Sequence, residues 1–201
     1  FEKVFDVDFA ADVTIMEEGT ELINRLQGDS VLPQFTSCCP AWVRFVENNY
    51  PNLIPNLSSA KSPQQMFGAI AKTYAAMNLR IDPGKMFVVS IMPCTAKKYE
   101  RSRDEMSAAA YYWQEKGQDD HYPDVDAALT TRECAKLLKR LNINLTELPE
   151  SAPDSLMGEY SGAATIFGRT GGVMTAALRT AYEIVTGYEI PDLELVSFGD
   201  Y

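Results

Sequence analysis

Short apolar runs and helix-spaced apolar positions alternate along the chain. Ile15, Leu22 and Leu26 recur at helical spacing and predict a helix over residues 13–27, with Asp12 as its N-terminal cap. Two apolar runs, over residues 31–35 and 86–92, predict short buried strands. A third strand is expected over residues 126–129.

Further helices are predicted after these strands. Pro40 suits the first turn of a helix over residues 41–49, and another helix opens at Ser62-Pro63 and runs through residues 65–77. A helix over residues 132–141 is capped by Thr130 or Thr131, and a last helix follows the glycine-rich loop 168–172. Strands separated by helices predict an α/β fold: a mainly parallel sheet flanked by helices, with the active site at the carboxyl ends of the strands.

Composition narrows the class of protein. The 201 residues carry 18 Lys and Arg against 28 Asp and Glu, a formal net charge of −10, which argues against a nucleic-acid partner. Four cysteines are too few for a disulfide scaffold and suit a reducing cytoplasm. The sequence has no run of 18 apolar residues and no signal peptide, and its first residue is Phe1, so we expect the start not to be a natural one.

Cysteines follow two of the predicted strands directly. Cys38 and Cys39 come after the first strand, and Cys94 comes after the second. If these strands are neighbours, the thiols converge in a metal or iron–sulfur site, and the absence of a C-x-x-C pair argues against a redox couple. The alternative is that they are buried structural thiols. Lys97, three residues past Cys94, adds a cation that could hold a thiolate or another anion. Cys134, at the start of a helix, is interpreted as a core residue, and the lone His121 as part of a surface loop.

Four longer strings make the chemistry more specific. They are TSCCPAW at residues 36–42, NLSSAKSPQQ at 56–65, MPCTAKKYE at 92–100 and IFGRTGGVM at 166–174. They resemble the catalytic domain of the iron-only hydrogenases, and the resemblance covers nearly the whole chain. The glycines of the last string match no nucleotide-binding loop, so we interpret them as a tight turn that lets backbone pack closely.

The resemblance implies a cofactor and its ligands. In that family the active site is the H-cluster, a 4Fe–4S cubane joined through a cysteine thiolate to a two-iron subcluster that carries carbon monoxide and cyanide. Carried over, Cys39 and Cys94 are two of the cubane ligands, and Lys97 hydrogen-bonds a cyanide. The residues implied to line the diiron pocket are Met92, Ser62, Pro63, Gln64 and Phe167.

The resemblance also implies a path for protons. Cys38 passes protons to and from the diiron unit, and the path then runs through Glu21, Ser58 and Glu18, with Arg25 at its outer end. Glu18, Glu21 and Arg25 are spaced i, i+3, i+7, so they share one side of the first predicted helix. The alternative is a solvated helix face with a surface ion pair, worth roughly a few tenths of a kcal/mol.

The chain also departs from the family pattern. The family's third motif, which holds the other two cubane cysteines, is absent, so we expect residues 1–201 to be a partial catalytic domain. Alone it is expected to be inactive, to retain no cluster, and to self-associate. An insertion at about residues 104–124 contains AAAYYWQEK, which predicts an extra helix with an apolar face that packs on the domain or binds a partner.

The function implied is reversible reduction of protons to dihydrogen by the parent enzyme, an oxidoreductase of anaerobic hydrogen metabolism. Its implied partners are the remainder of the hydrogenase polypeptide and an electron carrier such as ferredoxin. The alternative is a non-catalytic iron–sulfur relative, either a hydrogen sensor or a cluster-assembly protein. The expected location is the cytoplasm, although some members of the family are periplasmic.

Overall fold

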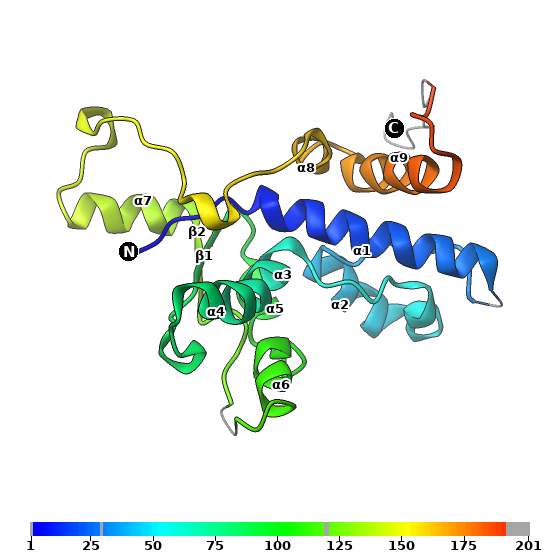
Figure 1. Cartoon of the computed structure of the whole chain (residues 1–201), viewed down its shortest axis with the longest axis horizontal. Coiled ribbons are helices and arrows are strands. Elements are labelled where there is room, and N and C mark those ends of the chain that lie inside the picture. The colour runs from blue at the N-terminus through cyan, green and yellow to red at the C-terminus, as the bar shows by residue number, and fades with distance from the viewer. Residues whose placement is uncertain (1, 29, 119–120, 192–201) are drawn as a thin grey trace. The chain divides into compact units, whose positions relative to one another are not determined.

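The computed structural model describes residues 2–28, 30–118 and 121–191, and its elements are labelled in Figure 1. The chain divides into two compact units. One unit comprises Phe1–Phe5 and Gln64–Gly158, and the other comprises Asp6–Pro63 and Glu159–Tyr201. The expected α/β class is confirmed, with helices predominating over a small parallel sheet. None of the described helices is long and apolar enough to cross a membrane.

The unit built on residues 64–158 contains the sheet. Strands β1 (Val89–Met92) and β2 (Ala127–Thr130) pair in parallel, from Val89 opposite Ala127 to Met92 opposite Thr130. The helical elements around them are α3 (Pro63–Ile70), the π turn η2 (Ala71–Ala75), α4 (Ala76–Leu79), η3 (Pro83–Lys85), α5 (Ala96–Glu100), α6 (Ala108–Gln114), α7 (Thr131–Arg140), η4 (Leu145–Glu147) and η5 (Ser155–Met157).

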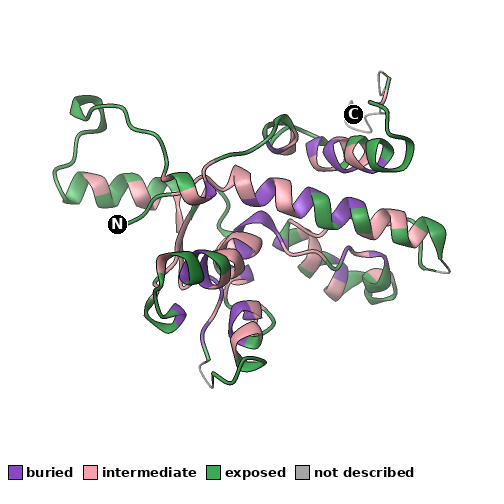
Figure 2. Ribbon diagram, in the orientation of Figure 1, coloured by how far each residue is buried: buried purple, intermediate pink, exposed green. Residues whose placement is uncertain are grey.

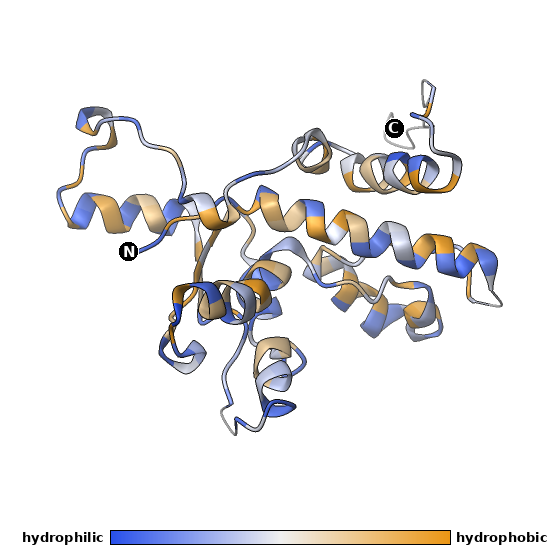
Figure 3. Ribbon diagram, viewed as in Figure 1, coloured by the Kyte–Doolittle hydropathy of each residue, from blue (hydrophilic) through white to orange (hydrophobic). Residues whose placement is uncertain are grey.

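Several sequence predictions for this unit are confirmed. Both strands and the extra helix within residues 104–124 are present, and Thr130 caps α7. Thr130 accepts a hydrogen bond from the Glu133 amide while the Glu133 carboxylate accepts from the Thr130 amide, which is a reciprocal capping box. Cys134 is not a core residue: it is half-buried, and α7 mixes hydrophobic and hydrophilic side chains with none of its residues buried (Figures 2 and 3).

The other unit is helical. It contains α1 (Asp8–Gln27), α2 (Pro40–Asn49), η1 (Pro51–Asn56), α8 (Gly162–Phe167) and α9 (Gly172–Thr186). Helices α1 and α9 lie side by side (Figure 1), and they are in contact at Gly19, where a Cβ would lie at an ordinary van der Waals distance of 3.7 Å from the Ala177 carbonyl oxygen. Gly187, in the left-handed region at φ 73°, ends α9.

Two expectations for this unit are wrong. Residues 31–35 form no strand; only Phe35 makes a parallel bridge, to Leu57. Pro33 lies within that run and has no N–H for a ladder hydrogen bond. Asp12 does not cap α1, which begins four residues earlier at Asp8. Its carboxylate instead accepts hydrogen bonds from Ser161 and from the Ala164 amide, at the first turn of α8.

Candidate functional site

One side of α1 carries an ion pair that reaches the loop after it. Nε and Nη2 of Arg25 donate to Oε1 of Glu21 at 3.0 and 2.6 Å. The same guanidinium donates to three backbone carbonyls, those of Val31, Pro55 and Leu57, at 2.8–3.0 Å. Both side chains are less than a fifth exposed. The interpretation as a solvated surface pair is therefore wrong, because both side chains are largely buried and Arg25 donates hydrogen bonds to three backbone carbonyls.

Ser58 continues the contacts from Glu21. Its hydroxyl donates to Oε2 of Glu21 at 2.6 Å and accepts from the Ala60 amide at 3.1 Å. The Ser59 amide donates to the same carboxylate at 3.0 Å. Burial acts to raise the pKa of Glu21, but the hydrogen bonds from Ser58, Arg25 and Ser59 outweigh it and hold the pKa below its ordinary value. Glu21 is therefore a carboxylate at neutral pH.

Glu18 is the second carboxylic acid of the group, and it is only 1% exposed. The Ser37 amide approaches Oε1 at 3.4 Å, and Oε2 has no hydrogen-bond partner within the described part of the chain. Burial raises the pKa of Glu18 to about 7, opposed by hydrogen bonding to Ser37 and Ser58 and assisted by the charge of Glu21. Glu18 can therefore hold or release a proton near neutral pH.

The expected order of the two glutamates is wrong. Glu18 was expected next to Arg25, but Arg25 binds Glu21, four residues before it on the helix. Glu18 instead contacts the Ser37 amide, and Ser37 immediately precedes Cys38. The spatial order is therefore Arg25, Glu21, Ser58 and then Glu18, toward the cysteine-bearing loop.

Cys38 and Cys39 lie at the start of α2, in the same unit as the glutamates. Cys39 is the N-cap residue of the helix, Pro40 occupies its first turn, and Cys39 is exposed whereas Cys38 is half-buried. The unit also holds three of the expected pocket residues: Ser62 and Pro63 are buried, and Phe167, at the end of α8, is half-buried.

The other unit holds the remaining predicted site residues around the end of β1, namely Cys94, Met92, Gln64 and Lys97. Cys94 is exposed between β1 and α5, and Met92 is the last residue of the strand. Lys97 donates to Glu100 Oε2 at 3.0 Å, and Gln64 is only 1% exposed. The meeting of Cys39 with Cys94 stays a prediction. Within the described residues, no three or more His, Cys, Asp or Glu side chains are grouped as metal ligands.

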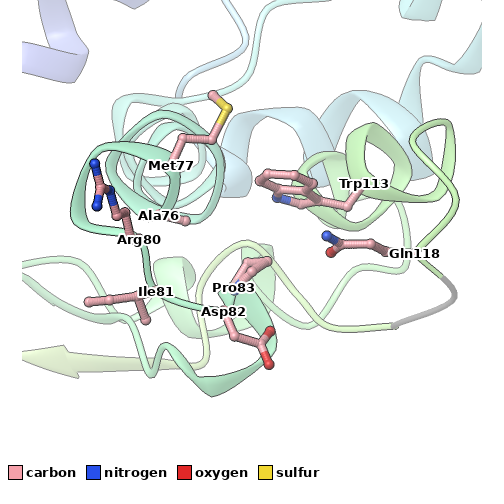
Figure 4. Close-up of a pocket in the computed structure, with 8 residues that line it drawn as sticks. All are labelled: Ala76, Met77, Arg80, Ile81, Asp82, Pro83, Trp113 and Gln118. Carbon is pink, nitrogen blue, oxygen red and sulfur yellow. The ribbon is translucent and has the colours of Figure 1, made fainter.

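Sequence reasoning missed the residues that support these side chains. The sequence pattern indicates no role for Glu100, and the one signal for Ser90 is that it is polar within an apolar strand. A shallow pocket of about 400 Å³ was also missed. It lies where α6 and the segment after it face the end of α4 and the start of η3 (Figure 4). Its lining residues are Ala76, Met77, Arg80, Ile81, Asp82, Pro83, Trp113 and Gln118.

Comparison with known proteins defines the class of this chain. The sequence profile of the iron-only hydrogenase large subunit, C-terminal domain, matches residues 1–200. The chain belongs to that family, as the cysteine motifs indicated.

Individual relatives agree. The chain is 50% identical to iron hydrogenase 1 of Clostridium pasteurianum over 96% of its own length and 32% of that protein. It is 53% identical to the NADP-reducing hydrogenase subunit HndD of Solidesulfovibrio fructosivorans, over 100% of the chain and 33% of that protein. An apo FeFe-hydrogenase from Chlamydomonas reinhardtii superposes with a TM-score of 0.81 and 47% identity, covering 100% of this chain and 48% of that one.

More distant relatives have another role in their names. The cytosolic iron-sulfur assembly component 3 of Bos taurus is 30% identical over 94% of the chain and 40% of that protein. The chain thus spans about a third of the length of the Clostridium and Solidesulfovibrio hydrogenases, and less than half of the Chlamydomonas hydrogenase and of the assembly protein.

Proposed function

We propose that this chain is part of a hydrogenase that interconverts two protons, two electrons and dihydrogen. The observation that carries the proposal is the hydrogen-bonded series from Arg25 through Glu21 and Ser58 to the vicinity of Glu18. A buried catalyst that consumes or releases protons needs titratable groups between itself and solvent. An assembly protein that does not turn over hydrogen has no such need.

The donor chemistry of the chain fits an iron–sulfur cofactor. The thiols of Cys39 and Cys94 are exposed, each beside the start of a helix, and cysteine thiolates are the usual ligands of such clusters. We propose that they hold the cubane of an H-cluster, and that the longer parent polypeptide supplies two further ligands. When bound, this cofactor supplies the metal centre at which protons and electrons combine.

Other residues are proposed to hold the diiron part in place. Lys97 donates to a cyanide ligand, as an ammonium beside a permanent anion can. The residues proposed to surround the diiron group and exclude water from it are Met92, Ser62, Pro63, Gln64 and Phe167. Gln64, Ser62 and Pro63 are buried already, so this part of the lining needs little ordering when the group binds.

The chain's own residues explain how a proton moves. Arg25 holds Glu21 as an anion that can accept a proton from the solvent side. The Ser58 hydroxyl can accept one proton while it donates another, so it connects the two carboxylic acids. Glu18, with its pKa about 7, can hold the proton and pass it toward Cys38 without a large free-energy cost in either direction.

Substitution of Glu18 in the complete, matured parent protein tests this function. We expect Glu18→Gln to lower hydrogen turnover at least 100-fold, because the amide cannot carry a proton, while the iron content and the infrared bands of the cofactor stay unchanged. Glu17→Gln, one position away and exposed, is the control and should keep full activity. Unchanged turnover in Glu18→Gln would refute the proton role.

The cysteines provide a second arm of the same test. Cys38→Ala should keep the cubane and lose turnover, whereas Cys94→Ala should lose iron. A parent protein that holds iron but evolves and oxidises no hydrogen would favour the assembly role instead. Ferredoxin as the electron carrier and the cytoplasm as the location are part of this proposal and are tested by reduction assays and by fractionation of the source cells.

A further inference from the structure

Lys97 is part of a buried network of hydrogen-bonded polar side chains in the unit that carries Cys94. Lys97 Nζ donates to both carboxylate oxygens of Glu100, at 3.0 Å to Oε2 and 3.3 Å to Oε1. Glu100 is 3% exposed, and the ammonium side chain is 13% exposed. A carboxylate this deeply buried needs charged and hydrogen-bonded partners, because it has lost nearly all its water.

Gln64 supplies the second partner of Glu100. Its Nε2 donates to Oε2 of Glu100 at 3.1 Å and to the Lys97 carbonyl oxygen at 3.1 Å. The same side chain therefore holds both the carboxylate and the backbone of the residue that bears the ammonium. Gln64 comes from the first turn of α3, so this contact joins α3 to α5.

Ser90 determines which way the Gln64 amide faces. Its hydroxyl donates to Oε1 of Gln64 at 2.7 Å, which leaves Nε2 on the side of Glu100. With the amide reversed, a carbonyl oxygen would face the Glu100 carboxylate and the Ser90 hydroxyl would face an amide nitrogen. Ser90 belongs to β1, two residues before Met92, so the network connects three elements around the segment that carries Cys94.

We propose that Glu100, supported by Gln64 and Ser90, is a positioning residue that fixes the direction of the Lys97 ammonium toward the diiron group. The inference rests on the proposed function, which assigns Lys97 its role toward a cyanide ligand. A lysine side chain has four flexible carbon–carbon bonds, and it donates three hydrogens from one nitrogen. The Glu100 carboxylate contacts Nζ through both of its oxygens, so it holds the end of the Lys97 side chain in one position, which a flexible exposed lysine would not have.

Lys98 provides a matched control in the same helix. Its ammonium donates to Glu133 Oε1 at 2.6 Å, but the side chains of Lys98 and Glu133 are each about two-fifths exposed. Glu133→Gln therefore removes the anion partner of a neighbouring lysine without entering the buried network. Comparing Glu100→Gln with Glu133→Gln distinguishes the general effect of losing an ion pair from the specific effect of losing the Lys97–Glu100 pair.

The first measurement is acylation of individual lysines in the complete parent polypeptide before the diiron group is loaded, followed by mass spectrometry. In Glu100→Gln we expect Lys97 to be labelled at least threefold faster and Lys98 at an unchanged rate. Glu133→Gln should show the reverse. Ser90→Ala should raise the labelling of Lys97 by a smaller factor, and it serves if Glu100→Gln does not fold. Equal labelling of Lys97 in the parent and in whichever of these variants folds would overturn the proposal.

The second measurement is infrared spectroscopy of the loaded protein. In Glu100→Gln the cyanide bands should shift or broaden, and Glu100→Asp, which keeps the charge, should recover part of the change. A merely structural role would lower the amount of loaded protein without moving the bands, and unmoved bands would overturn the proposal. If the parent protein itself shows no cyanide bands, the proposed function fails, whereas the labelling experiment still decides whether Glu100 anchors Lys97.

Discussion

Ser58 and Glu21 are 37 residues apart in sequence, and the Ser58 hydroxyl donates to Oε2 of Glu21 at 2.6 Å. This contact joins the segment after η1 to the middle of α1. It depends on Arg25, which binds the other carboxylate oxygen of Glu21 and the carbonyls on both sides of Asn56. One guanidinium therefore maintains both the charge of Glu21 and the position of Ser58.

Replacing Arg25 should reveal this double role. Arg25→Lys keeps the charge but loses the planar set of donors, so we expect a loss of about 1–3 kcal/mol in the free energy of unfolding. Denaturant titration measures it. Lys85→Arg is the control, since Lys85 pairs with Asp82 on an exposed surface and the same change of cation there should cost less than about 0.5 kcal/mol. Equal stability of the Arg25→Lys variant and the unsubstituted chain would contradict the hydrogen bonds assigned to the Arg25 guanidinium.

The raised pKa of Glu18 makes a prediction about stability and pH. Below about pH 4.5 the Glu18 carboxyl is protonated in both the folded and the unfolded chain. Its contribution to the free energy of unfolding is then fully present. Between pH 4.5 and about 7 the unfolded chain releases it while the folded chain keeps it, so stability falls as pH rises. The full loss is up to about 3 kcal/mol, from a pKa that rises from 4.5 to about 7.

Glu18→Gln removes that dependence. The variant should gain up to about 3 kcal/mol relative to the parent chain between pH 5 and pH 8, measured as the difference in unfolding free energy at each pH. Glu17→Gln should show no such change, because Glu17 is exposed on the same helix. A constant difference between Glu18→Gln and the parent across this range would show that burial does not raise the pKa of Glu18.

Local features of the fold were predictable from sequence because their partners lie close together in the chain. The cap of α7 by Thr130 needs only Glu133, three residues away, and Pro40 marks the start of α2 by itself. The i, i+4 spacing of Glu21 and Arg25 already favours their pairing, which the structure shows.

Long-range features could not be predicted in this way. The partner of Ser90 is Gln64, 26 residues earlier, and the sequence pattern of an apolar strand contains nothing that indicates it. The run over residues 31–35 shows the opposite error. Its apolar residues favoured a strand, but the missing N–H of Pro33 leaves only one bridge, at Phe35.

Lys72 is another residue whose role only the structure shows. It lies in the π turn η2 and is 1% exposed, and its ammonium contacts Asp126 at 2.7 Å and the Pro123 carbonyl oxygen at 2.8 Å. Asp126 in turn accepts from the Val88 amide at 2.7 Å, beside the start of β1. Lys72 thus ties the end of the expected insertion to the parallel sheet.

Lys72→Met should therefore cost about 3–5 kcal/mol of unfolding free energy, because it leaves the Asp126 carboxylate without its cation. Combining it with Asp126→Asn should recover part of the loss, since the uncompensated charge is then removed. Denaturant unfolding of both single variants and the double variant measures the coupling. Additive losses, with no recovery in the double variant, would contradict a direct ion pair.

The glycine-rich loop before α9 offers a test of close backbone packing. A Cβ at Gly172 would lie 1.9 Å from the Ile166 carbonyl oxygen, far inside van der Waals contact, so position 172 has no room for a side chain. At Gly168 a Cβ would meet no atom within 4 Å, and the residue has an ordinary φ of −75°.

Gly172→Ala should thus destabilise the chain by at least about 2 kcal/mol, because the backbone of α8 must shift to admit the methyl group. Gly168→Ala should change stability by less than about 1 kcal/mol, since the methyl group enters open space. Thermal unfolding of the two variants makes the comparison directly. Similar melting temperatures for both would mean that the loop does not approach Ile166 as closely as the structure shows.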